Sequence, residues 1–149
     1  MAGPIPGVHA LIAPVLYSFQ QAREDTAKCS GWLTTEQIWA TPHGFGSVGF
    51  HIWHIAGSVD RLITYLEGKQ LFEAQMAALL AEKEPGATLE ELLAAMDGAF
   101  HRAELVARAI EPARLTKLRE VGRKRLSRQD HCRVGEGRSA SFGRSPGIV

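Results

Sequence analysis

The sequence predicts an all-α protein, built as an up-and-down helical bundle whose fourth long helix is degraded or missing. Three observations predict this class. Apolar residues recur at spacings of three and four over three long stretches of the 149-residue chain, which is the helical period. Helix-capping signals precede two of those stretches, and Gly or Pro follows all three. We find no convincing strand-like alternation of apolar and polar residues.

The first long helix is predicted over residues 8–29. Pro14 is comfortable only in the first turn of a helix, so the regular part should begin near Ala13. The residues that recur on one face, and that we expect to face the core, are Leu11, Val15, Phe19, Ala22 and Thr26.

A short helical turn is predicted at residues 34–39, because Thr34 and Gln37 have the spacing of a capping box. A loop rich in Gly and Pro follows it. Ser47 should then cap a second long helix, which runs to Glu67 and stops at Gly68.

Residues 72–83 form a weaker helical segment, which the sequence Glu84-Pro85-Gly86 ends. A second capping-box pattern, Thr88 to Glu91, opens a helix that we expect to reach Ile110, before Pro112. The apolar face of that helix is predicted to comprise Leu89, Leu92, Leu93, Met96, Phe100 and Leu105.

The chain divides at about residue 126. Residues 8–126 are predicted to form the helical domain, and residues 127–149, rich in Arg, Gly and Ser, a disordered tail. Three long helices without a fourth leave an apolar groove open. We expect a partner chain, a dimer mate or a fourth helix that this chain lacks to fill it, and we expect the protein to be a homodimer.

Charge and composition narrow the function classes. Residues 1–113 carry seven basic and thirteen acidic side chains, whereas residues 114–149 carry ten and three. Such asymmetry can mark a nucleic-acid-binding arm, but Phe142 alone supplies an aromatic ring in the tail, so we do not expect nucleic-acid binding. No apolar run approaches the roughly 18 to 20 residues needed to cross a membrane. The N-terminus lacks the basic stretch of a secretory signal, and the two cysteines suit a reducing cytoplasm.

The second long helix carries His51 and His54, three residues apart and therefore neighbours on its surface. Histidine is the commonest metal ligand in proteins. On a helical wheel the predicted core face consists of Val48, Ile55, Val59, Leu62 and Leu66. His51 lies at the edge of that face, and His54 lies further round, in a polar sector with Ser47, Ser58 and Tyr65. Two interpretations stay open at this point: a metal site between helices, or histidines at a helix edge that are solvated or hydrogen-bonded to a neighbouring helix.

The other histidines are weaker candidates. His9 precedes the first helix, His43 lies in a Gly- and Pro-rich loop, and His101 lies beside Arg102 in the middle of a helix. His131 and Cys132 offer one nitrogen and one sulfur, but no predicted element positions them. Two ligands do not make a tight site, because zinc centres use three or four protein ligands.

Residues 15–25 and 46–58 resemble the first two helices of the DinB/YfiT-like superfamily, whose members are metal-binding four-helix bundles. The resemblance runs from about Val8 to Leu126. It implies that His54 is a metal ligand and that His51 is a further ligand or supports it. The implied cofactor is a divalent ion, Zn, Ni, Mn or Fe. Relatives complete the site with histidines in a fourth helix, which this chain replaces with its Arg/Gly/Ser tail. We therefore hypothesise that the residues after Leu126 are an out-of-frame translation.

The resemblance also implies a metal-dependent enzyme similar to thiol S-transferases, in which the ion presents a small-molecule thiol as its thiolate, here with an incomplete metal site. In such a site Ser58 or Tyr65 would orient substrate or water. The alternative is a non-catalytic helical interaction module that dimerises through the open apolar groove.

Overall fold

The computed structural model describes residues 3–117 and the backbone of residues 120–121 and 124–125. Its long helices are α1 (Ala13–Ser30), α3 (Val48–Leu66) and α5 (Leu89–Arg108), and its short helices are α2 (Thr35–Trp39) and α4 (Glu73–Ala81). One 3-10 turn, Pro42–Gly44, lies between α2 and α3, and another, Pro112–Arg114, follows α5. Strand β1 (Glu120–Val121) pairs antiparallel with β2 (Lys124–Arg125). The protein is therefore an all-α bundle with one very short hairpin.

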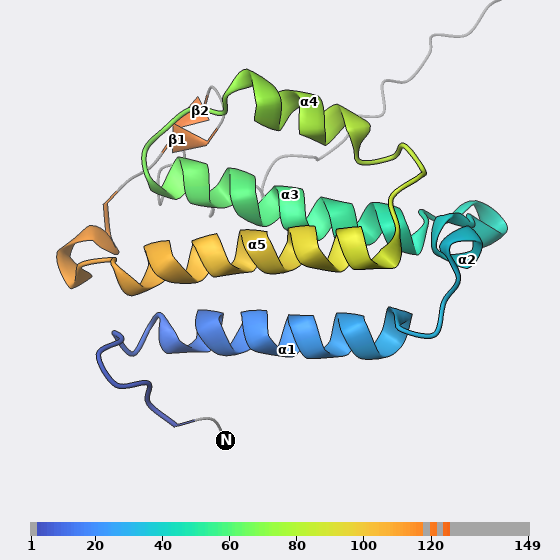
Figure 1. Ribbon diagram of the computed structural model, residues 1–149. Helices are drawn as coiled ribbons and strands as arrows, with labels where there is room; N and C mark the ends of the chain where they lie inside the picture. Colours follow the sequence, from blue (N-terminus) through green and yellow to red (C-terminus); the bar gives the residue numbers. More distant parts are fainter. Residues whose placement is uncertain (1–2, 118–119, 122–123, 126–149) are drawn as a thin grey trace, which may run out of the picture.

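The helices lie in layers, with α5 between α1 and α3, and with α4 on the other side of α3 (Figure 1). Helices α1, α3, α4 and α5 alternate in direction along the chain, as an up-and-down arrangement requires. Because α4 returns the chain, α3 and α5 run parallel to each other, and they form the most extensive contact of the bundle.

Local signals set the helix ends where the sequence predicts them. Pro14 occupies the first turn of α1. The Ser47 hydroxyl accepts a hydrogen bond from the backbone N–H of Phe50 at 3.1 Å, which caps α3. Both predicted capping boxes form, at the starts of α2 and α5. Gly68 follows α3 with a φ of +81°, a conformation that glycine adopts without a steric penalty.

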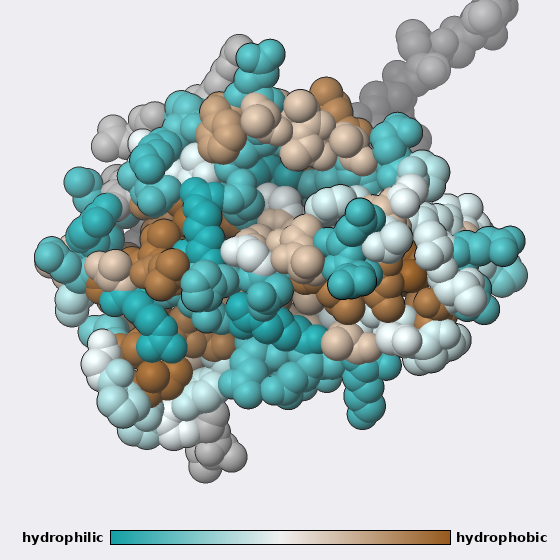
Figure 2. Space-filling view, viewed as in Figure 1, coloured by the Kyte–Doolittle hydropathy of each residue, from teal (hydrophilic) through white to brown (hydrophobic). Residues whose placement is uncertain are grey.

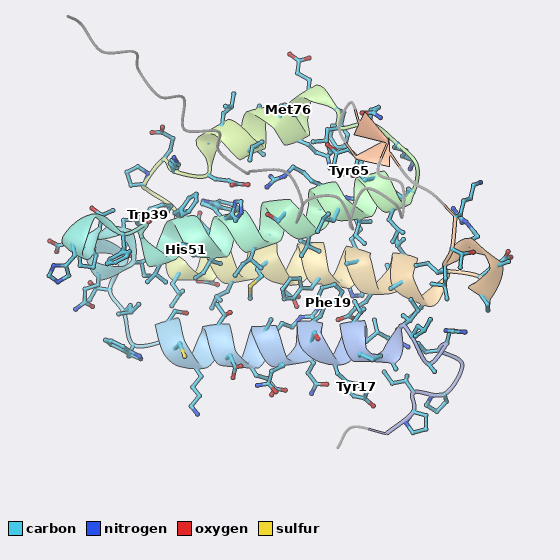
Figure 3. The ribbon with its side chains drawn as sticks, turned by 180° about the vertical axis from the view of Figure 1, so that it is seen from behind. Tyr17, Phe19, Trp39, His51, Tyr65 and Met76 are labelled. Carbon is cyan, nitrogen blue, oxygen red and sulfur yellow. The ribbon has the colours of Figure 1, made fainter. Side chains whose placement is uncertain are left out.

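The main core lies between α3 and α5, and α2 closes one end of it. Its buried residues are Ile38, Ile52, Ala56, Leu92, Met96 and Phe100. Helix α1 reaches this core through Phe19, whose ring stacks on Phe100 with centroids 4.8 Å apart (Figure 3).

The predicted core faces are partly wrong. On α3 the buried residues are Gly49, Ile52, Ala56, Ile63 and Thr64, whereas Val48, Ile55 and Leu62 are exposed. The buried face is rotated by about 80° from the predicted one, because α3 is apolar over nearly half its circumference and a helical wheel cannot choose between two adjacent apolar stripes. In the same way Leu11, Val15 and Leu105 are exposed, and Ile12, Leu16, Ala103 and Ala107 are buried.

Charged and polar groups hold the outer helices to the bundle. Arg23 of α1 pairs with Asp97 at 2.6 Å and with Glu104 at 2.5 Å, both on α5. Burial alone would lower the pKa of Arg23, but these two carboxylates outweigh it, and the pKa is raised. Helix α4 docks through Gln75, which is buried and donates to Thr64 of α3 at 2.8 Å and to Asp60.

The outward face of α4 is apolar. Phe72, Met76 and Leu80 are exposed there, and apolar side chains gather along this edge of the surface (Figure 2). The buried residue of α4, Gln75, is polar. None of the helices described is long and apolar enough to span a bilayer.

The predicted loss of a fourth long helix concerns residues that lie largely outside those described. Between α5 and residue 125 the described residues form the second 3-10 turn and the β1–β2 hairpin. Residues 126–149, which include the predicted tail and the hypothesised out-of-frame segment, lie beyond the described part. Those two predictions therefore stay predictions.

Candidate functional site

The two predicted metal ligands lie near the start of α3, one turn apart. His54 is about half exposed, with 49% of its side chain accessible, and His51 is exposed. The Phe50 ring contacts both imidazoles, with centroids 5.1 Å from His51 and 5.5 Å from His54. The phenyl ring therefore lies against both candidate ligands.

A residue that sequence reasoning did not find completes the surroundings of His54. Glu82, directly after α4, is buried, with 5% of its side chain accessible. Its Oε2 lies 2.7 Å from Nδ1 of His54, and its Oε1 lies 2.7 Å from Nη1 of Arg61. One buried carboxylate therefore joins an imidazole and a guanidinium from the same helix.

Ser58 lies one turn beyond His54, as the sequence predicts, and the structure brings the two together. Its Oγ is 3.4 Å from Nε2 of His54 and accepts a hydrogen bond from Arg61 at 3.2 Å. Tyr65 lies two further turns along α3 (Figure 3). Ser58 is thus the better placed of the two residues for orienting a molecule at His54.

Glycine allows the Glu82 carboxylate to approach α3 closely. A Cβ on Gly57 would lie 2.5 Å from Oε1 of Glu82 and 2.6 Å from Nη1 of Arg61, closer than real Cβ atoms come. A signal for this contact was present in the sequence, because a glycine inside a helix often marks a close approach.

The donors fit a divalent ion in kind but not in number. Imidazole nitrogen suits Zn, Ni and Fe, and His54 has one ring nitrogen engaged by a carboxylate, as metal-bound histidines usually do. Within residues 3–117, however, no group of three His, Cys, Asp or Glu side chains is placed to hold one ion. A catalytic zinc centre needs about three protein ligands, so the described residues do not form a complete site by themselves.

The weaker candidates lie elsewhere. His9 accepts a hydrogen bond from the backbone N–H of Leu11 at 3.2 Å, ahead of α1. His43 lies in the first 3-10 turn with a φ of +57°, and His101 is exposed on α5. His131 and Cys132 lie outside the described residues.

A groove of about 280 Å³ runs between α3 and α5 beside Glu82. Trp53, Ala56 and Ala99 line it together with the charged residues Asp60, Glu82 and Arg102, of which Asp60 and Arg102 pair with each other. The volume is near the lower end of small-molecule pockets, about 300 Å³. Glu82 therefore borders both this groove and His54.

Taken together, these features define a helical bundle with an ionisable site built around a histidine of α3. The family model of the DinB superfamily matches residues 18–131, most of the chain. The chain belongs to the DinB superfamily. A search of curated proteins finds no match to it.

Proposed function

We propose that this DinB-superfamily protein is a metal-dependent enzyme in which Nε2 of His54 is a ligand of a divalent ion. The observation that carries the proposal is the half-exposed His54 ring, because Glu82 engages its Nδ1 and leaves Nε2 toward Ser58. His51, one turn earlier, is the second imidazole on the same helix. The remaining ligands would come from outside the residues described or from a second chain.

The resemblance that assigns His54 also supports a small-molecule thiol as the substrate class. A divalent ion bound at His54 would stabilise the thiolate form of such a substrate. The residues of this chain would do the positioning: Ser58 and Arg61 offer hydrogen bonds beside the ring, and the α3–α5 groove offers an apolar floor.

Removal of metal tests this proposal. We expect purified full-length protein to carry a divalent ion and to lose it to a chelator. The stripped protein should then take up Zn²⁺ or Ni²⁺ again, at no more than about one ion per protein chain. Elemental analysis and calorimetric titration of the stripped protein measure both steps. Protein that carries no ion and gives no binding isotherm with Zn²⁺, Ni²⁺, Mn²⁺ or Fe²⁺ would contradict the proposal.

The second candidate function is a non-catalytic interaction module, and one observation favours it. Val48, Ile55 and Leu62 are exposed on α3 at intervals of seven residues, the spacing of a helix-pairing seam. Leu62 is 59% exposed. The proposed partner is a second copy of this chain.

For this second candidate we expect a homodimer that stays intact in chelator and that Leu62→Glu converts to a monomer, because the charge would be buried at the seam. Leu80→Glu, on the outward face of α4, is the matched control and should remain dimeric. Sedimentation velocity measures the three proteins. A monomeric wild type, or equal dimerisation of both variants, would exclude this seam.

A further inference from the structure

The protonated nitrogen of the His54 ring follows from its partner. An ionised carboxylate only accepts hydrogen bonds, so the 2.7 Å contact with Glu82 needs a proton on Nδ1 of His54. A neutral imidazole carries one proton, so Nε2 then carries the lone pair, which the Ser58 hydroxyl faces at 3.4 Å. The identity of residue 82 therefore decides which ring nitrogen is available to an electrophile or a metal ion.

Three groups hold the Glu82 carboxylate in this position. Arg61 binds its other oxygen at 2.7 Å, and Gly57 leaves the space that the carboxylate and guanidinium occupy. Helix α4 positions the carboxylate, because Glu82 is the C-cap residue of α4 and Gln75 hydrogen-bonds that helix to Thr64. Glycine inside a helix is less favourable than alanine, and the close approach of the carboxylate and guanidinium explains why a glycine stands at position 57.

We propose that Glu82 is a positioning residue that fixes the Nδ1–H tautomer of His54, so that docking of α4 sets which ring nitrogen carries the lone pair. The tautomer itself can be tested without any metal. Its consequence for metal affinity rests on the proposed function, in which Nε2 is the ligand atom.

Glu82→Gln should invert the tautomer. Arg61 can only donate, so it takes the oxygen of the introduced amide and turns the amide NH₂ toward His54. Nδ1 must then accept, which places the proton on Nε2. The nitrogen-15 spectrum of the His54 ring in metal-free full-length protein, at a pH where the ring is neutral, measures the two tautomers. Glu84→Gln, two residues away and exposed, is the control and should leave the tautomer unchanged.

Gly57→Ala tests the same contact between Glu82 and His54 without changing any charged group. The added methyl group would displace Glu82 or Arg61, so we expect loss of the Nδ1–H form although alanine favours the helix. Gly98→Ala on α5 is its control, because a Cβ there meets nothing within 4 Å. Circular dichroism confirms that each variant is folded.

Metal titration separates failure of this inference from failure of the proposed function. We expect Glu82→Gln to weaken Zn²⁺ binding by about 10- to 100-fold, as loss of such a partner typically does. A tautomer that inverts in a protein that binds no Zn²⁺ supports the role of Glu82 and contradicts the metal proposal. An unchanged tautomer in both Glu82→Gln and Gly57→Ala overturns the role of Glu82, whatever the affinity for Zn²⁺.

Discussion

Phe100→Ala should lower the free energy of unfolding by about 3–5 kcal/mol, the largest stability change we expect from one substitution in the described residues. Phe100 is 2% exposed and lies where the three long helices meet. Its ring stacks on Phe19 of α1 and lies 5.3 Å from the guanidinium carbon of Arg23. Truncation therefore removes buried apolar contacts and leaves a cavity between α1 and α5.

Urea unfolding followed by circular dichroism measures this change. Leu105→Ala is the matched control, because Leu105 lies on the same helix but is exposed, and its truncation should alter the free energy of unfolding by less than about 1 kcal/mol. Equal effects of the two substitutions would mean that α1 and α5 do not pack as described.

His54→Ala should produce the largest functional change. Loss of a partner of a ligand weakens metal binding by about 10- to 100-fold, and we expect loss of the ligand itself to exceed that range. The substitution leaves the ion pair between Glu82 and Arg61 in place, and we expect this pair to keep α4 docked on α3. Calorimetric titration of the full-length variant with Zn²⁺ measures the affinity, and circular dichroism checks the fold.

His101→Ala is the matched control for His54→Ala. His101 is an exposed histidine in the middle of α5, so its removal should leave Zn²⁺ affinity unchanged. If both variants bind Zn²⁺ like the wild type, His54 is not a ligand. If both variants lose binding equally, Zn²⁺ binds to exposed histidines in general, and the assignment of the site to α3 is wrong.

The sequence predicted the helices well because their ends are local properties. The caps at Thr34, Ser47 and Thr88 and the stop at Gly68 each depend on residues within a turn of the boundary, and all four lie where the pattern placed them. The family resemblance is likewise confirmed by the match over residues 18–131.

The sequence predicted tertiary contacts less well, because those depend on partners far along the chain. The exposed stripe of Val48, Ile55 and Leu62 was predicted as core, since the apolar arc of α3 is wider than the face that α5 covers. The sequence did not predict the role of Glu82, because Glu82 stands in a charged run with Lys83 and Glu84. No local signal indicates which of the two carboxylates contacts α3.

The most direct measurement of the central claim is the nitrogen-15 spectrum of the His54 ring while Zn²⁺ is added to the full-length protein. We expect the Nε2 resonance to move as the ion binds, while Nδ1 keeps its proton and its contact with Glu82. Zn²⁺ binding that leaves the Nε2 resonance of His54 unchanged would contradict it.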